Sequence, residues 1–377
     1  MRARPQRLER LPEQYFTGLL ARVAAAAAAE GDELIDLGRG NPDLPPPPHV
    51  VEALAGAARA PEAHGYPPFR GIPELRDAVA ARYRDVYSVE LDPHEDVAVV
   101  PGTKTAIVEL ALGLAERGDT ILLPDPGYPD YTSGVALAGA REMRVRLDPK
   151  AAFAPALDWG PRRGVAALYL NYPSNPCAAS APPGVFAEAV RYAEETGAAV
   201  VHDFAYADLV FDGLRPQSFL AEPGAKEVGV ELFSMSKSYG MAGWRLGFVV
   251  GSAEIVERVN LLQDHARAGV FRPVQEAGVV ALTGPQETVE ERRALYQERR
   301  DRVVAAIPGA LSDSTFYVWW RLPERLTPER LLAETRVAVA PGEGFGPQGR
   351  GWARISLATP DERLDAGLAR LRPLAAP

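Results

Sequence analysis

The sequence predicts an α/β protein, with a large and mostly parallel sheet sandwiched by helices and a smaller α+β domain. Apolar, β-rich runs alternate with helical patterns between residues 97 and 267, which is typical of a parallel sheet covered on both faces. After about residue 285 a long charged helix and short strands replace this alternation. A chain of 377 residues also exceeds the roughly 250–300 residues that one core usually supports. We therefore expect two domains.

Strands are predicted first, because their ends locate the ligand site. The predicted strands are residues 97–100, 120–123, 166–170, 198–202, 230–234 and 247–250. Helices are predicted at residues 105–116, 129–137, 184–195 and 253–267. Sheets of this kind bind ligands at the carboxyl ends of their strands. The polar motifs of this chain follow such strands, so we expect them to lie together.

The remaining elements form the smaller domain in this prediction. They are a helix at residues 286–307, a hairpin-like segment at 315–322, a helix at 328–334, short strands and a last helix. The Gly- and Pro-rich segment 31–48 is predicted to be an extended connection after an N-terminal helix. We expect residues 1–45 to form an arm and part of the small domain, 46–285 the large domain, and 286–377 the rest of the small domain.

Composition and charge exclude several function classes. A net charge of −9 provides no basic surface for a polyanion, so we expect neither nucleic acid nor a membrane as a partner. Cys177 is the only cysteine, which rules out an intrachain disulfide and a zinc site built from several thiolates. The basic start of the chain lacks the apolar stretch of a signal peptide. These features predict a cytoplasmic protein without a metal.

Lys237 is the most informative residue, because the chain contains only four lysines. A primary amine is needed to form an imine, and a guanidinium cannot replace it. The hydroxyls of Ser234 and Ser236 and the guanidinium of Arg245 are suited to binding one phosphate beside this amine. A primary amine beside a phosphate-binding group suggests pyridoxal phosphate chemistry. The alternative is an ordinary solvated lysine in a surface loop.

Asp203 and Tyr206 follow the predicted strand at residues 198–202. A carboxylate beside a pyridine nitrogen keeps it protonated, so that the ring can accept the electrons of a carbanion. Tyr206 is suited to bonding the phenolic oxygen of that ring. The alternative is a helix-capping Asp with a packing Tyr.

Two further turns follow predicted strands. Gly102, Thr103 and Lys104 open a helix, where free N–H groups and the helix dipole favour a phosphate. Asn175 lies in the segment 171–176, whose Asn-Pro pairs otherwise simply make turns. For the first turn, the alternative is that Thr103 only caps the helix.

Together these motifs resemble the class I/II aminotransferases among the fold-type I pyridoxal-phosphate enzymes. The family pattern Ser-x-Ser-Lys, a gap, then Gly-x-Arg-x-Gly is matched at residues 234–247, and the resemblance runs from about Leu34 to Leu357. The chain departs from the pattern at Pro173, which is displaced, and at Cys177-Ala178, where Thr-Gly is usual. The resemblance implies a seven-stranded sheet and pyridoxal 5'-phosphate in the large domain. The start of the match looks nearest to the diaminopimelate and aspartate/alanine branch.

The resemblance also implies a role for each motif residue. Lys237 holds the cofactor as an internal aldimine and then acts as the base, while Asp203 bonds the pyridine nitrogen. The other implied cofactor contacts are Tyr206 and Asn175 to the phenolic oxygen, Tyr128 stacked on the ring, and Gly102, Thr103, Lys104, Ser234, Ser236 and Arg245 at the phosphate. Arg354 and Asn175 bind the substrate carboxylate, with Gly40 beside it. Arg39, larger than expected there, is predicted to recognise an extra anionic group.

Tyr66 matches a segment that in the family reaches the phosphate of the neighbouring subunit. This implies a homodimer with shared active sites.

The implied activity moves an amino group from an L-amino acid to a 2-oxo acid, through quinonoid and pyridoxamine intermediates. A pyridoxal-phosphate lyase, cyclase or carbon–carbon bond-forming enzyme is the alternative, because the same intermediate serves all of them. Arg39 and the unusual Cys177-Ala178 pair favour that alternative. A cofactor-sensing regulatory protein is disfavoured by the acidic charge and by the short segment before the match.

Overall fold

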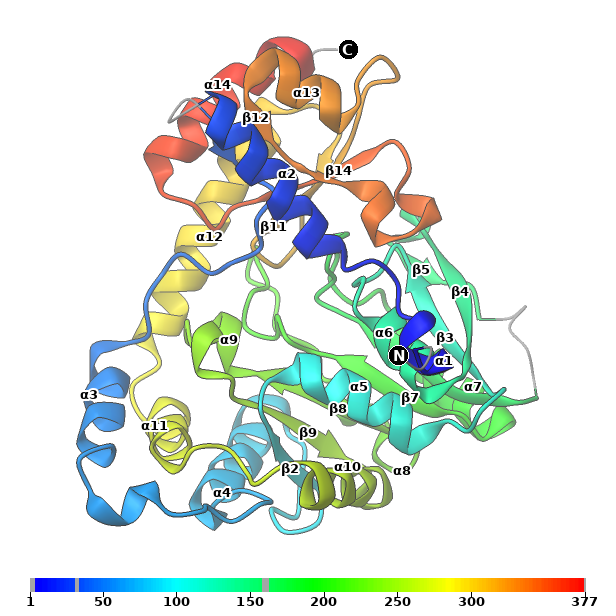
Figure 1. Cartoon of the computed structure of the whole chain (residues 1–377), viewed down its shortest axis with the longest axis vertical. Coiled ribbons are helices and arrows are strands. Elements are labelled where there is room, and N and C mark those ends of the chain that lie inside the picture. The colour runs from blue at the N-terminus through cyan, green and yellow to red at the C-terminus, as the bar shows by residue number, and fades with distance from the viewer. Residues whose placement is uncertain (1–3, 31–33, 158–162, 376–377) are drawn as a thin grey trace.

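A computed structural model describes residues 4–30, 34–157 and 163–375 and shows two layered parts (Figure 1). The larger part is built on one sheet with the strand order β2-β9-β8-β7-β6-β3-β4-β5. In that order the strands are Val97–Val100, Gly247–Gly251, Gly229–Ser234, Ala199–Asp203, Val165–Asn171, Thr120–Asp125, Arg141–Asp148 and Ala154–Pro155. β9 is antiparallel to both of its neighbours and β5 is antiparallel to β4, whereas the remaining pairs are parallel. The α/β class predicted from the sequence is confirmed.

All six predicted strands are present, but two strands were missed. β4 alternates charged with apolar residues in a sequence dominated by Arg and Glu, and most of its first half is solvent-facing. β5 is a two-residue edge strand that makes the sheet eight-stranded instead of seven-stranded. A strand that exposes part of its side chains has a weak apolar pattern, and a strand of two residues has almost none.

Helices cover both faces of this sheet, as predicted. One face carries α5 (Thr103–Leu114), α6 (Tyr131–Ala138) and α10 (Ala253–Ala266); the other carries α4 (Pro73–Arg82), α7 (Val185–Thr196) and α8 (Ala225–Val228). Alternate residues of a strand point to opposite faces. Ala98 and Val100 of β2 therefore pack in a first core, under α5, α6 and α10. Val97 and Val99 pack in a second core, under α4, α7 and α8. α3 (Pro48–Ala57) packs on α11 (Arg272–Thr283) at the side of the same part.

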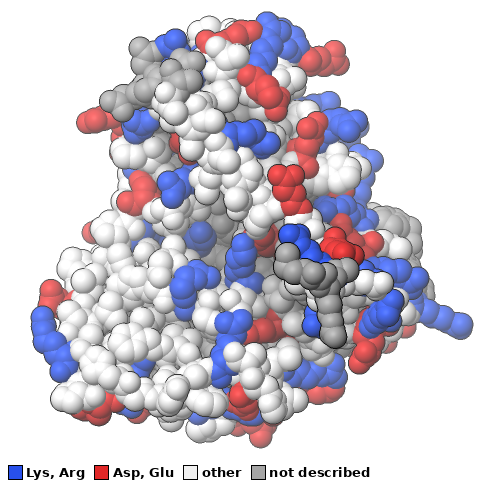
Figure 2. Space-filling view, in the orientation of Figure 1, with Lys and Arg blue, Asp and Glu red and all other residues white. Residues whose placement is uncertain are grey.

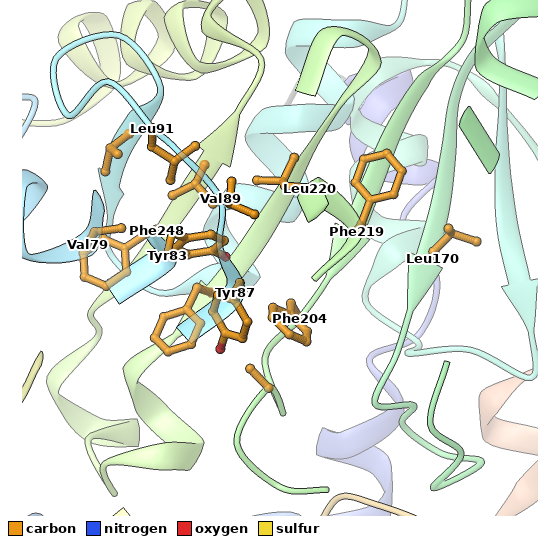
Figure 3. Close-up of a cluster of buried hydrophobic side chains, with 14 of the residues drawn as sticks. Val79, Tyr83, Tyr87, Val89, Leu91, Leu170, Phe204, Phe219, Leu220 and Phe248 are labelled. Atoms are coloured by element: carbon orange, nitrogen blue, oxygen red, sulfur yellow. The ribbon is translucent and has the colours of Figure 1, made fainter. Parts of the chain in front are cut away.

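The second core fixes the end of β7. Phe204 is fully buried in it, and its ring lies 5.4 Å from that of Tyr87. Figure 3 shows both side chains among the aromatic residues of this cluster. Because Phe204 is anchored on this side, the preceding Asp203 is directed to the other side of the backbone. The core thus orients a predicted site residue.

The smaller part has its own sheet, with the order β10-β11-β14-β13. Its strands are Ala310–Leu311, Tyr317–Arg321, Trp352–Ser356 and Ala340–Pro341, and its helices are α12 (Glu287–Ala306), α13 (Pro328–Thr335) and α14 (Asp361–Ala375). The hairpin-like prediction for residues 315–322 is wrong. Tyr317–Arg321 is a single strand between β10 and β14, because it contains no turn residues and buries both of its faces.

The N-terminal segment joins the two parts. After the short α1 (Gln6–Glu9), which contacts α6 of the large part, α2 (Tyr15–Glu30) runs across the small part (Figure 1). β1 (Ile35–Asp36) pairs with β12 (Val337–Ala338), and Ile35 packs in the core of the small part. Residues 31–33 of the predicted connection lie outside the described residues, and the boundaries at 45 and 285 stay a prediction. Among the described residues, no helix is long and apolar enough to cross a membrane.

Candidate active site

A cavity of about 250 Å³ lies at the carboxyl ends of the sheet strands. β6 ends at Asn171, β7 ends at Asp203, and β2 is followed by the turn at Gly102. The cavity is lined by Phe16, Leu19, Leu20, Arg39, Gly40, Asn41, Thr103, Lys104, Ile107, Tyr128, Asn171, Asn175, Asp203, Ala205, Tyr206, Lys237 and Tyr317. Figure 2 shows basic side chains gathered around the central hollow of this face. The predicted gathering of motifs at one edge of the sheet is confirmed.

Lys237 lies in the one-turn helix α9 (Met235–Ser238), directly after β8. Its Nζ atom is 5.3 Å from the ring centroid of Phe316 and 5.8 Å from that of Tyr206. Burial, together with the positive charges of Arg354 and Arg245, lowers the pKa of this lysine from 10.5 to about 8. A substantial fraction of the amine is therefore neutral near physiological pH. A neutral amine is a nucleophile and a base.

Asp203 is held by a set of donors at the floor of the cavity. Tyr131 donates its hydroxyl to Oδ2 at 2.7 Å, and the backbone N–H of Ala205 donates to Oδ1 at 3.2 Å. Burial raises the pKa of Asp203, and the hydrogen bond from Tyr131 opposes that rise by stabilising the carboxylate. Asn171 donates to the backbone carbonyl of Asp203 at 2.8 Å and so ties β6 to β7 here.

Arg354, from β14 of the small sheet, is fully buried and is the positively charged group that the small part contributes to the site. Its Nη1 donates to Oδ1 of Asn175 at 2.7 Å, and its Nη2 donates to the carbonyl of Gly38 at 3.0 Å. The Nε atom is buried without a hydrogen-bond partner. A side chain at Gly40 would collide with the hydroxyl of Tyr317 and crowd Arg354, so glycine is required there. A buried guanidinium with an unused donor is suited to a carboxylate ligand.

Gly102 and Arg245 form one corner of the site, although they are far apart in the sequence. Gly102 has a φ of +84°, and a Cβ added to it would collide with the guanidinium of Arg245. Thr103 is the first residue of α5, whose free N–H groups favour an anion. The turn and the arginine thus come together as the phosphate prediction requires. Ser234 and Ser236 are both buried, and Oγ of Ser234 accepts the N–H of Ser236 at 3.2 Å.

Lys104 lines the cavity, but its ammonium already has a partner. Its Nζ lies 2.8 Å from Oδ2 of Asp130, whose side chain is only 4% exposed. Gln14, just before α2, donates its amide to the other carboxylate oxygen. The side chain of Lys104 is thus directed to this carboxylate, and only its backbone N–H belongs to the anion-binding helix start.

Aromatic side chains close the cavity. Tyr206 donates its hydroxyl to that of Tyr317 at 3.1 Å, and both line the cavity. Tyr128 also lines it, with its ring centroid 5.5 Å from Tyr131. Phe16 of α2 lies 5.9 Å from Tyr128 and 5.8 Å from the guanidinium of Arg354. Part of the N-terminal helix is therefore a wall of the site.

Two predicted residues lie at the margin. Arg39 is exposed and lines the cavity mouth. Tyr66 is 88% exposed and does not line the cavity of its own chain. Its role at a neighbouring subunit stays a prediction.

Sequence analysis missed several contributors. Tyr131, Asn171 and Tyr317 hold predicted residues in place through hydrogen bonds. Asp130 forms an ion pair with Lys104. The wall contributed by α2 consists of Phe16, Leu19 and Leu20. Tyr131 had a local signal, since it follows Tyr128 by three residues at the start of a helix. The α2 residues had none, because they approach the site only through the folding of the two parts against each other.

Comparison with known proteins identifies a family. The family model for aminotransferase class I and II matches residues 32–371. The L-glutamine–4-(methylsulfanyl)-2-oxobutanoate aminotransferase of Bacillus subtilis strain 168 is 44% identical over 97% of this chain and 94% of its own length. The LL-diaminopimelate aminotransferase of Moorella thermoacetica is 39% identical over 97% of each chain.

A structural match extends over the whole chain. The substrate-bound structure of BacF from B. subtilis superposes with a TM-score of 0.94, at 36% identity, over 100% of this chain and 99% of that one. The B. subtilis protein BacF is named a transaminase. The matches cover nearly the whole chain, in both sequence and fold. The chain belongs to the class I and II aminotransferases.

Proposed function

We propose that this aminotransferase binds pyridoxal 5'-phosphate in the described cavity and moves an amino group from an L-amino acid to a 2-oxo acid. The observation that carries the proposal is Lys237, whose pKa is lowered to about 8 beside an anion-binding corner and a buried carboxylate. Pyridoxal phosphate supplies an aldehyde for the lysine and a ring that accepts electrons from the substrate α-carbon.

The residues fit this cofactor in three places. The corner of Gly102 and Arg245 leaves no room for a side chain and presents a guanidinium and helix N–H groups to a phosphate. Asp203 presents a carboxylate to a ring nitrogen, and Tyr128 offers an aromatic face. These three features suit the phosphate, the ring nitrogen and the aromatic ring of pyridoxal phosphate.

The chain's own residues then divide the remaining tasks. Arg354 and Asn175 bind the α-carboxylate of the amino acid, because the Nε atom of the arginine lacks a partner and its Nη1 is aimed by the amide. Lys237 moves the α-proton, since its lowered pKa keeps a neutral amine available. Phe16 and the other α2 residues exclude water from this end.

A second chain completes the site in this proposal. Tyr66 is exposed together with Phe69 and Phe271, which are 41% and 48% exposed. The surface over α3 and α11 carries few charged side chains in Figure 2. Large exposed aromatic residues on a weakly charged face favour a protein interface. We therefore infer a homodimer in which Tyr66 reaches the phosphate of the partner chain.

The names of the relatives favour transamination over the lyase or cyclase alternative. The test is to purify the protein and its Lys237→Ala variant, supply pyridoxal phosphate, and record the visible absorbance of the lysine-bound cofactor. Addition of amino acids, glutamine and methionine among them, should abolish that band. A 2-oxo acid such as 4-(methylsulfanyl)-2-oxobutanoate should restore it.

The variant should show neither change, although it is expected to fold. Release of the substrate side chain, or of ammonia without any 2-oxo acid acceptor, would instead establish elimination. A wild-type protein that binds no cofactor would overturn the proposal.

A further inference from the structure

Asp130 is a buried carboxylate whose purpose the transamination chemistry leaves open. It stands at the start of α6 but makes no capping hydrogen bond to that helix. Its two oxygens instead engage side chains from two other elements, Lys104 of α5 and Gln14 before α2. With a side chain only 4% exposed, this carboxylate is fixed in place by its surroundings.

The pairing cancels a positive charge at the cavity wall. Lys104 lines the cavity with a side chain that is 54% exposed, so its ammonium would otherwise face an incoming ligand. A buried carboxylate at 2.8 Å compensates that charge more effectively than mobile counter-ions do. The wall therefore presents a neutral ion pair there.

The rest of the side-chain region is largely apolar. Phe16, Leu19 and Leu20 of α2 and Ile107 of α5 line it. Apart from Lys237, which the proposed function assigns to the cofactor, Arg39 is the other basic residue among the lining residues, and it is exposed at the mouth, where water screens its charge. An uncharged side chain finds suitable contacts in this region.

A second carboxylate on the substrate would meet an obstacle here. It would have to displace Asp130 from Lys104, or stay beside the ion pair without a full counter-charge. Displacement would leave the carboxylate of Asp130 buried and unpaired, which is costly. Specificity often arises from such an unfavourable term against the wrong ligand.

We propose that Asp130 is a specificity-determining residue, which occupies Lys104 and thereby selects amino acids and 2-oxo acids with uncharged side chains over dicarboxylic ones. The inference rests on the proposed function, in which Arg354 takes the α-carboxylate and the side chain points toward this wall.

The test compares glutamine with glutamate, which have nearly the same shape and differ in charge. In Asp130→Asn the carboxylate charge is lost at almost constant volume, and Lys104 is released to pair with the ligand. The ratio of kcat/KM for glutamate to that for glutamine should rise about fivefold over wild type. The double variant Asp130→Asn/Lys104→Met should lose this gain, because the gain requires the released ammonium.

Arg39 provides the matched control. Arg39→Gln added to Asp130→Asn should keep the gain if Lys104 is its source. An unchanged or lowered ratio in Asp130→Asn, or a gain that survives removal of Lys104, would overturn the inference.

Binding of glutarate, an unreactive dicarboxylate, gives a readout independent of turnover. Its dissociation constant, measured by the absorbance change of the cofactor-loaded protein, should fall about fivefold in Asp130→Asn. If the wild type transaminates no amino acid of the panel used for the proposed function, that function fails, and glutarate binding still decides the role of Asp130. Thermal unfolding of each variant establishes that it is folded.

Discussion

At the scale of single residues, the site is dominated by charges that act on one amine. Burial and the guanidinium groups of Arg354 and Arg245 all disfavour the protonated form of Lys237, while Asp203 alone opposes them. The same two arginines are the anion-binding groups of the proposed function. One arrangement thus recruits the ligands and keeps the nucleophile neutral.

The first prediction concerns the pH dependence of this amine. Because the neutral form attacks the aldehyde and the pKa is lowered to about 8, capture of pyridoxal phosphate by the cofactor-free protein should accelerate as pH rises. Half of the maximal rate should be reached near pH 8, well below the value for a free lysine. Stopped-flow absorbance measures this rate, and a midpoint near 10 would contradict the assigned environment.

The second prediction concerns the hydrogen bond from Tyr131 to Asp203. Tyr131→Phe removes the donor that stabilises the carboxylate, so the pKa of Asp203 should rise further. A carboxylate less able to hold its charge should bind the ring nitrogen less well. We expect the dissociation constant of pyridoxal phosphate to increase about tenfold.

Tyr169→Phe is the control for this variant. Tyr169 is equally buried and contacts the ring of Tyr131, but its hydroxyl donates to the carbonyl of Ile107. Equal losses of affinity in the two variants would mean that the effect is one of packing. Titration of the cofactor-free proteins by tryptophan fluorescence compares them.

At the scale of elements, neighbouring strands are joined by a buried polar network next to the site. His202 of β7 and Glu231 of β8 are register partners, and Nδ1 of the histidine lies 2.8 Å from Oε1 of the glutamate. Glu231 also accepts the hydroxyl of Ser218 at 2.8 Å and the N–H of Phe219 at 2.5 Å. All of these groups are buried, so each depends on the glutamate for its partner.

The third prediction follows from this dependence. Glu231→Ala leaves several buried donors without an acceptor and should lower the free energy of unfolding by about 3–5 kcal/mol. Glu254→Ala, on the solvent-facing side of α10, removes a glutamate side chain that is 76% exposed and should change the free energy of unfolding by less than about 0.5 kcal/mol. Urea denaturation followed by circular dichroism distinguishes the two. Similar stabilities would show that the network contributes little.

At the scale of the whole molecule, each cavity is formed by both parts of the chain. Among its lining residues, Tyr317 comes from the small sheet, Lys237 and Asp203 from the large part, and Phe16 from the N-terminal helix. Tyr66, by contrast, is 88% exposed and does not line the cavity of its own chain. A complete site therefore needs a second copy in the proposed dimer.

The fourth prediction tests this sharing. Tyr66→Ala and Lys237→Ala should each impair activity. A mixed dimer, with one chain of each variant, contains one site in which both residues are native. After mixed refolding, roughly a quarter of the wild-type activity should return, because half of the dimers are mixed and each has one intact site. Activity is measured by coupled transamination. No recovery would place Tyr66 outside the partner's site.

The sequence by itself determined the class of the fold and the chemistry of the site. Apolar runs predicted the strands that are buried along most of their length, because such strands have a strong hydrophobic pattern. Lys237, Arg245 and Asn175 were visible in short motifs, because each needs a particular local turn and a particular functional group.

Only the tertiary structure decided which groups hold the site residues in place and which neutralise their charges. Tyr131 meets Asp203 across 72 positions, and Asp130 meets Lys104 and Gln14 across three elements. The two-residue β5 and the α2 wall are defined by what they pack against. Contacts between distant segments depend on how the whole chain folds, and a local pattern of residues contains no record of them.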